Sequence, residues 1–131
     1  MAKILVVDDS PTEIHLIKAM LGSHGHEVLE ASNGEQGVTK ATRELPDLVL
    51  MDIVMPGLNG FQATRQISRN SRTRHIPVVI VTTKDQETDR VWGKRQGARG
   101  YLLKPLNEPL LLETIDALLV GSVAEASLDG V

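Results

Sequence analysis

Residues 48–57, LVLMDIVMPG, place four apolar side chains directly before an aspartate and a turn. A short apolar run without polar alternation is typical of a strand that is buried on both faces of a sheet. Asp52 follows the run, and Pro56 with Gly57 ends it, so the acid stands at the carboxyl end of the predicted strand. Open α/β sheets carry their ligand sites at that end. The sequence therefore predicts a functional role for Asp52.

Four more β-rich segments surround this strand at regular spacing. The five predicted strands are KILVVD (3–8), HEVLEA (26–31), DLVLMD (47–52), PVVIVT (77–82) and GYLLK (100–104). The segments between them have helical periodicity, and Ser10 and Asn33 stand at N-cap positions, with Glu13 as a capping-box acid for the first helix. Strands that alternate with helices predict a parallel sheet with helices on both faces. The expected fold class is α/β, with a doubly wound parallel sheet.

The same pattern predicts one domain over residues 1–119. The last helix begins near Glu108 and keeps an apolar face to about Leu119. Residues 120–131, VGSVAEASLDGV, are mostly small and polar. We expect a short flexible C-terminal tail there and no output domain.

Composition excludes several classes of function. The formal net charge of −3 gives no general attraction for nucleic acid or an anionic membrane, and one Phe, one Trp and one Tyr are too few for a base-stacking platform. The absence of cysteine excludes disulfides and favours a reducing compartment. In the opening MAKILVVDDS, the apolar run is too short for a signal peptide or a membrane span. We expect a cytoplasmic protein that binds neither nucleic acid nor membrane.

The other predicted strands also end on polar residues. Asp8 and Asp9 follow the first strand, whereas Thr82 ends the fourth and Lys104 ends the fifth. Because parallel strands share one carboxyl edge, these residues should meet Asp52 in one crevice. Three clustered carboxylates need protons or a cation, and oxygen ligands without histidine or cysteine favour Mg²⁺. Lys104 and Thr82 suit phosphoryl oxygens, which makes Asp52 a candidate nucleophile.

Each of these residues also has an ordinary structural interpretation. Asp9 stands where an N-cap belongs, Thr82 is a common strand residue, and Lys104 fits a solvated strand end. Their joint placement at one edge favours a site over three coincidences. Trp92 fits either a half-buried helix anchor or a partner-binding residue, and the sequence leaves both open.

Together, the segments ILVVDDS, DLVLMDIVMPGLNGFQATR, VVIVTT and GARGYLLKP resemble the receiver domain of bacterial two-component response regulators, the CheY-like family. The resemblance covers residue 3 to about residue 119. It implies a flavodoxin-like (βα)5 fold with strand order 2-1-3-4-5. It also implies a phosphoacceptor switch, not an enzyme, that takes a phosphoryl group from a sensor histidine kinase onto Asp52.

The resemblance assigns roles to individual residues. Thr82 and Lys104 would contact the phosphoryl group, and the Lys104–Pro105 peptide bond would be cis. Thr82 would also couple to Tyr101, which changes the partner affinity of the face formed by the fourth helix, fifth strand and fifth helix. The implied cofactor is Mg²⁺, held by Asp8, Asp9, Asp52 and the backbone carbonyl of Val54.

A narrower resemblance concerns the pathway. DIVMPGLNGFQATRQ and TTKDQETDRVWGKRQGARGYLLKP resemble the PilH-type regulators of type IV pilus twitching motility, which implies a downstream motility or pilus protein as partner. We expect a monomer. In this family the residues at the positions of Val54 and Lys84 tune the lifetime of the phosphoryl group, so an apolar Val54 predicts slower self-dephosphorylation than in the CheY prototype.

Two other functions remain open. A haloacid-dehalogenase-type phosphatase also combines an aspartyl nucleophile with Mg²⁺, threonine and lysine, but it requires Asp-x-Asp after the first strand, where this chain has DDS. A receiver-like domain that no longer accepts phosphate is the other alternative. It is disfavoured because no member of the acceptor set is missing.

Overall fold

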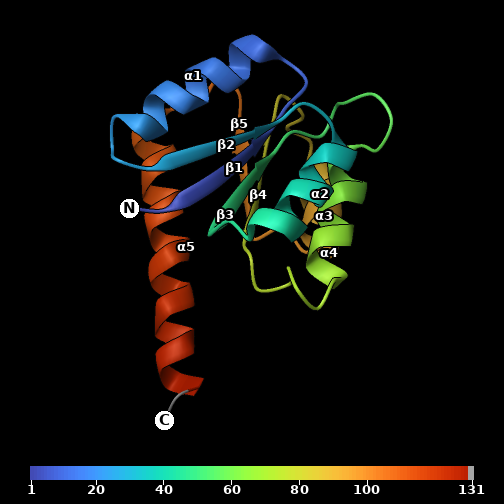
Figure 1. Ribbon diagram of the computed structural model, residues 1–131. Coiled ribbons are helices and arrows are strands. Elements are labelled where there is room, and N and C mark those ends of the chain that lie inside the picture. Colours follow the sequence, from blue (N-terminus) through green and yellow to red (C-terminus); the bar gives the residue numbers. More distant parts are fainter. Residues whose placement is uncertain (130–131) are drawn as a thin grey trace.

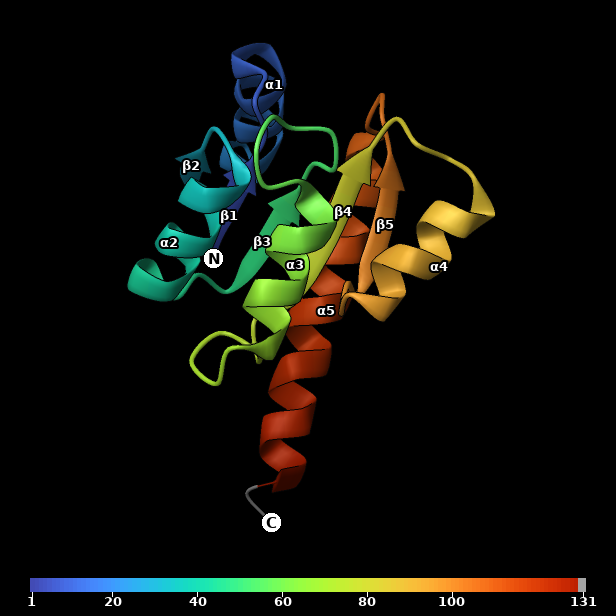
Figure 2. The ribbon, with the colours of Figure 1, turned by 90° about the vertical axis from the view of Figure 1, so that its right-hand side faces the viewer.

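The computed structural model describes residues 1–129, with side chains described for residues 1–120. Five parallel strands form one sheet in the order β2-β1-β3-β4-β5, which confirms the predicted class and strand order. Helices α1 and α5 cover one face of the sheet, and α2, α3 and α4 cover the other (Figure 1, Figure 2). The elements are β1 (Lys3–Val7), α1 (Pro11–Gly22), β2 (Glu27–Ala31), α2 (Gly34–Glu44), β3 (Leu48–Met51), α3 (Gly60–Arg69), β4 (Val78–Thr82), α4 (Glu87–Arg95), β5 (Gly100–Leu103) and α5 (Glu108–Asp129).

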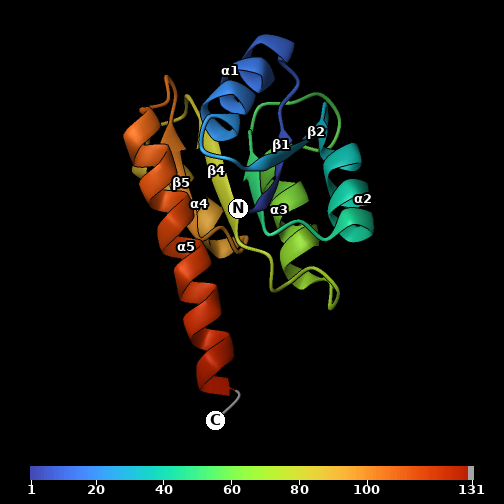
Figure 3. The same ribbon diagram turned by 60° about the vertical axis from the view of Figure 1, so that its left-hand side comes forward.

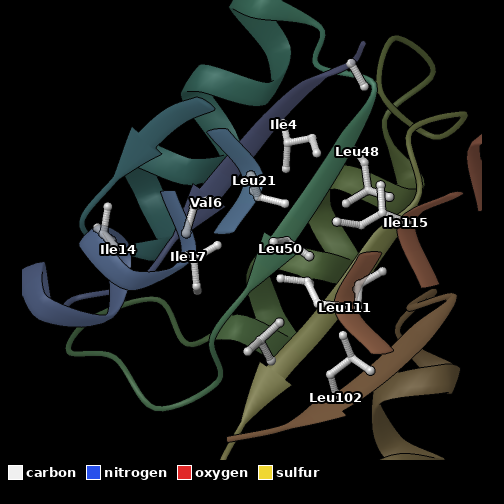
Figure 4. Packing of buried hydrophobic residues seen from close by; sticks show 13 residues of the cluster. Ile4, Val6, Ile14, Ile17, Leu21, Leu48, Leu50, Leu102, Leu111 and Ile115 are labelled. Atoms are coloured by element: carbon white, nitrogen blue, oxygen red, sulfur yellow. The ribbon is translucent and has the colours of Figure 1, made fainter. Parts of the chain in front are cut away.

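Strand β3 lies between β1 and β4, and all four of its residues are buried. Leu48 and Leu50 pack into one core with α1 and α5, as Figure 4 shows. Val49 and Met51 pack into a second core with α2 and α3. The apolar run is therefore a strand buried on both faces, as predicted. Its neighbours fix the point at which Asp52 leaves the sheet.

The start of α1 differs in part from its predicted cap. Ser10 Oγ accepts the backbone N–H of Glu13, so the N-cap is confirmed. The capping box is wrong, because the Ser10 N–H donates to Asp8 Oδ1 instead of to Glu13. The Glu13 carboxylate lies 4.0 Å from Lys104 Nζ. The Glu13 carboxylate thus lies beside the positive charge at the sheet edge.

The next two helices have full side-chain caps. Asn33 caps α2 by accepting the N–H of Gln36, as predicted. A complete capping box forms at α3, where Asn59 accepts the Gln62 N–H and the Gln62 side chain accepts the Asn59 N–H. These caps fix the beginnings of α2 and α3 at the edge of the sheet where the strands end.

Helix α5 is longer than its apolar pattern indicates. The predicted end near Leu119 lies inside the helix, which continues to Asp129 and projects beyond the sheet (Figure 1, Figure 3). Ala124, Glu125 and Ala126 are good helix formers, which accounts for the continuation. The flexibility expected for residues 120–131 stays a prediction, and residues 130–131 lie outside the described residues. Within residues 1–129, no helix is both long and apolar enough to cross a membrane.

Candidate functional site

Three carboxylates meet at the carboxyl edge of the sheet. Val7 pairs with Met51, so the residues that follow these two strands leave the sheet side by side. Asp8, Asp9 and Asp52 each place one carboxylate oxygen within 4.8 Å of the others. Asp8 and Asp52 are buried, whereas Asp9 is exposed. The structure thus brings together the three acids that the strand ends predicted.

Lys104 supplies positive charge to this cluster. It follows β5, and its side chain is 11% exposed. Its Nζ lies 2.8 Å from Asp8 Oδ2, 3.7 Å from Asp52 Oδ1 and 4.0 Å from Glu13 Oε2. Burial alone would lower the pKa of Lys104, but the hydrogen bond to Asp8 and the charges of Asp52, Asp8 and Glu13 outweigh it and raise the pKa. Lys104 is therefore held as a cation.

The pKa of the Asp52 carboxyl is clearly shifted from its ordinary value. Burial raises its pKa from 3.8 to about 6, and the charges of Asp8 and Asp9 act in the same direction. Lys104 and the Ile53 backbone N–H lower the pKa, but they do not cancel this increase. Burial is therefore the main reason why the carboxyl holds its proton above the ordinary pH range. A buried acid with a strongly shifted pKa at a sheet edge is a candidate functional group.

The donor set fits Mg²⁺. The clustered groups are carboxylate oxygens, which hard cations prefer, and the cluster contains no histidine or cysteine to favour a softer metal. A divalent cation would also stabilise the ionised form of Asp52, which burial and the charges of Asp8 and Asp9 disfavour. The predicted fourth protein ligand, the Val54 carbonyl, belongs to the loop that follows Asp52. The Val54 side chain is exposed and provides no polar group at this position.

Thr82 and Tyr101 are linked through the backbone of Lys84. Thr82 is fully buried at the end of β4, and its Oγ1 accepts the Lys84 N–H at 3.3 Å. The Tyr101 hydroxyl donates to the Lys84 carbonyl at 2.6 Å. The Arg90 guanidinium lies over the Tyr101 ring, 4.9 Å from its centroid. Burial, with the charge of Asp89, raises the pKa of Tyr101, so its hydroxyl keeps the proton that it donates.

The loop after β5 and the cleft beside the acids complete the site. The Lys104–Pro105 peptide bond is cis, the isomer that the family resemblance implies. Asp8 and Asp9 also line an open cleft of about 540 Å³ between α1 and the start of α2. His15, Ser32 and Gln36 are among the other residues that line it. The exposed side of the acid cluster is therefore accessible to a donor group.

Trp92 lies beside the residue through which α4 approaches the sheet. The residue of α4 that is buried is Gly93, and a Cβ on Gly93 would lie 2.8 Å from Ile80 Cδ1. Helix α4 thus approaches β4 through a glycine and not through the indole. Trp92 is 47% exposed, and Val91 beside it is 46% exposed. Trp92 is therefore about half exposed at the surface of α4, which fits both of its interpretations.

Three residues near the site were missed as site residues from the sequence. Glu13 was assigned to a helix cap but lies beside Lys104. Lys84 was considered only for the lifetime of a phosphoryl group, yet its backbone joins Thr82 to Tyr101. Glu35 accepts the backbone N–H of Leu58, in the loop after Asp52. No sequence signal marks these contacts, because they depend on how segments far apart in the chain pack together.

The sequence is similar to proteins of a known family. Residues 4–116 match the family described as the response regulator receiver domain. The chain is 67% identical over 121 residues to Protein PilH of Pseudomonas aeruginosa, covering 92% of this chain and 100% of that protein. It is 39% identical over 117 residues to the response regulator PleD of Caulobacter vibrioides, covering 89% of this chain and 26% of that protein.

Solved structures show the same architecture. The chemotaxis protein CheY4 of Vibrio cholerae, crystallised at low pH, aligns with a TM-score of 0.85 and 32% sequence identity, covering 90% of this chain and 98% of that one. A CheY-like receiver domain protein of Methanospirillum hungatei aligns with a TM-score of 0.89 and 28% identity, covering 95% of this chain and 98% of that one. The likeness extends over nearly the whole sheet and its helices.

Proposed function

The chain belongs to the response regulator receiver domain family, and from this premise we propose that it is a phosphorylation switch with Asp52 as the phosphoacceptor. The observation that carries the proposal is the buried Asp52 carboxylate, which two further carboxylates and the Lys104 ammonium surround. A carboxylate presented at a rigid strand end beside a fixed cation is suited to attack on phosphorus. The proposed phosphodonor is a sensor histidine kinase.

The transfer forms one bond and breaks one bond. An Asp52 carboxylate oxygen bonds to phosphorus, and the phosphorus–nitrogen bond of the donor phosphohistidine breaks. The electron pair of that bond stays on the imidazole nitrogen. The Lys104 ammonium and the Thr82 hydroxyl hold the phosphoryl oxygens. Asp8, Asp9, Asp52 and the Val54 carbonyl would hold Mg²⁺, which when bound would neutralise charge on those oxygens.

The proposed output uses the contact chain from Thr82 to Tyr101. Because the Lys84 backbone binds both side chains, a shift of Thr82 toward a phosphoryl group would pull on Lys84 and release or redirect the Tyr101 hydroxyl. Tyr101 lies at the face formed by α4, β5 and α5. Exposed apolar residues on these elements, available to a partner, include Val91, Trp92, Leu103 and Leu110.

The biological setting follows from the similarity to PilH. We place the protein as a switch in pilus or chemotaxis-type motility signalling, with a motility or pilus protein as the downstream partner. It acts as a monomer in the cytoplasm and assists its own phosphorylation and dephosphorylation without turning over an external substrate. The absence of cysteine from the sequence agrees with a reducing compartment.

Intact mass spectrometry tests the proposed function. With Mg²⁺ and acetyl phosphate, the wild-type protein should gain one phosphoryl group, because the small donor needs no kinase surface. With EDTA in place of Mg²⁺ the gain should be lost or greatly reduced, since the clustered carboxylates then repel the phosphoryl oxygens. No gain from acetyl phosphate or from a phosphorylated histidine kinase would refute the switch and leave a structural domain.

Replacement of Val54 should change the lifetime of the phosphorylated form. Val54 is 58% exposed and stands two residues after Asp52, where an apolar side chain does not orient an attacking water. We expect Val54→Asn to shorten the half-life about threefold to tenfold, because its amide can position that water. Decay is followed by the loss of the phosphorylated mass. Val91→Asn, at a similarly exposed valine on α4, serves as control, and equal half-lives for all three proteins would contradict the prediction.

A further inference from the structure

The loop that follows the phosphoacceptor is tied to α2 by one side chain. The β3–α3 loop (residues 52–59) contains Val54, Met55 and the turn at Pro56. The Leu58 backbone N–H donates to Glu35 Oε1 at 3.0 Å. Within residues 1–120, this is the single hydrogen bond that links residues 54–58 to the rest of the protein. The position of this part of the loop therefore depends on one carboxylate and on apolar packing.

Two glycines make room for this contact. A Cβ on Gly34 would overlap the Leu58 carbonyl, so the start of α2 can lie against Leu58 only because residue 34 has no side chain. Gly57 has a φ of 75°, and a Cβ there would lie 3.1 Å from Glu35 Oε1. The Glu35 carboxylate thus lies over the Gly57–Leu58 peptide. Glycine on both sides of the contact therefore leaves room for the carboxylate and the peptide to meet.

The other contacts of the loop lie on its inner side. Met55 is buried in the core beneath α2 and α3, and Leu58 packs partly against that core. Apolar packing holds these two side chains but does not fix the orientation of the peptide groups between them. A hydrogen bond from a charged acceptor is directional and stronger than a neutral one, so it can fix the peptide that follows Gly57.

We propose that Glu35 is a positioning residue that holds the β3–α3 loop in the conformation required for Mg²⁺ binding. The inference rests on the proposed function, because it takes the Val54 carbonyl as a metal ligand. Glu35 does not belong to the acid cluster and touches neither the metal nor the phosphoryl group. Its role is to limit the motion of a short loop that has Asp52 at one end and Leu58 near the other.

Calorimetric titration with Mg²⁺ alone tests the proposal. Glu35→Ala should raise the Mg²⁺ dissociation constant about threefold to tenfold, because the loop must be ordered when the ion binds. Glu35→Gln should stay within about twofold of wild type, because its amide oxygen can accept the same Leu58 N–H. In hydrogen-exchange NMR, the Leu58 amide should lose protection in the alanine variant and keep it in the glutamine variant.

The controls separate this role from charge and from folding. Glu87→Ala removes an exposed first-turn acid from α4 and should leave the dissociation constant unchanged. The melting temperature of each metal-free variant should change little, since both acids are exposed. Equal weakening by the alanine and glutamine variants would show a charge effect and overturn the proposal, as would an unchanged alanine variant. A wild-type protein that binds no Mg²⁺ would overturn the proposed metal site as well.

Discussion

Asp52→Asn is expected to gain no phosphoryl group from acetyl phosphate and Mg²⁺ under conditions that phosphorylate the wild type. An amide oxygen is a poor nucleophile toward phosphorus, whereas the carboxylate forms the acyl phosphate directly. The substitution preserves the shape of the side chain and its place at the end of β3. The loss should be complete within detection, and intact mass spectrometry measures it.

The control for this variant lies at the other end of the same strand. Asp47 precedes β3, is exposed, and accepts the Lys3 N–H at 2.7 Å. Asp47→Asn makes the same chemical change at the opposite edge of the sheet, so it should still gain one phosphoryl group. A gain by Asp52→Asn would transfer the acceptor role to another residue, with Asp8 and Asp9 as the nearest candidates. Peptide mapping of the modified protein would then identify the acceptor.

The parts of the site that could be predicted from the sequence are those that lie on strand ends. All strands of a parallel sheet end at the same edge, so the positions of Asp8, Asp52 and Thr82 follow from the strands that carry them. The run LVLM identifies β3 by its apolar residues, and the order of the strands follows from the family resemblance. The structure adds to these residues their burial and their distances from Lys104.

The contacts that could not be predicted involve long side chains and loop backbones. Glu13 satisfies the capping-box pattern, but its carboxylate lies beside the Lys104 ammonium, and the Ser10 N–H donates to Asp8 instead. Lys84 acts through its backbone, so its residue type carries no signal. Glu35 reaches a loop that is distant in the sequence. In each case the decisive partner lies on another element, and local pattern rules do not include it.

The C-terminal helix shows a different limit of prediction from the sequence. The apolar periodicity ends near Leu119, and Leu118 and Leu119 pack against the core on that face of the sheet. The helix itself continues to Asp129 through residues of high helix propensity, such as Ala124, Glu125 and Ala126. The end of the apolar periodicity therefore does not mark the end of this helix.

The unfolding free energy of the metal-free protein is expected to fall as pH rises from about 4 to 6, and Asp52→Asn should remove this fall. In the folded protein the pKa of Asp52 is raised to about 6, above the value of 3.8 in an unfolded chain. Between these values the folded state binds more protons than the unfolded state, so deprotonation favours unfolding. The ionised carboxylate costs the folded state about 3 kcal/mol at pH 7.5, whereas the cost falls to about 0.5 kcal/mol at pH 4 and vanishes at lower pH.

Urea unfolding in EDTA, followed by circular dichroism at pH 4 and pH 7.5, measures this difference. Asp52→Asn should exceed the wild type in stability by about 3 kcal/mol at pH 7.5 and by only about 0.5 kcal/mol at pH 4. Added Mg²⁺ should then stabilise the wild type more than the variant, because the ion offsets the charge that only the wild type carries. A stability difference that is equal at both pH values would contradict the assignment of the cost to Asp52 ionisation. The destabilising charge is the same one that the proposed phosphoryl transfer requires, so the site keeps a reactive carboxylate at the expense of the stability of the metal-free fold.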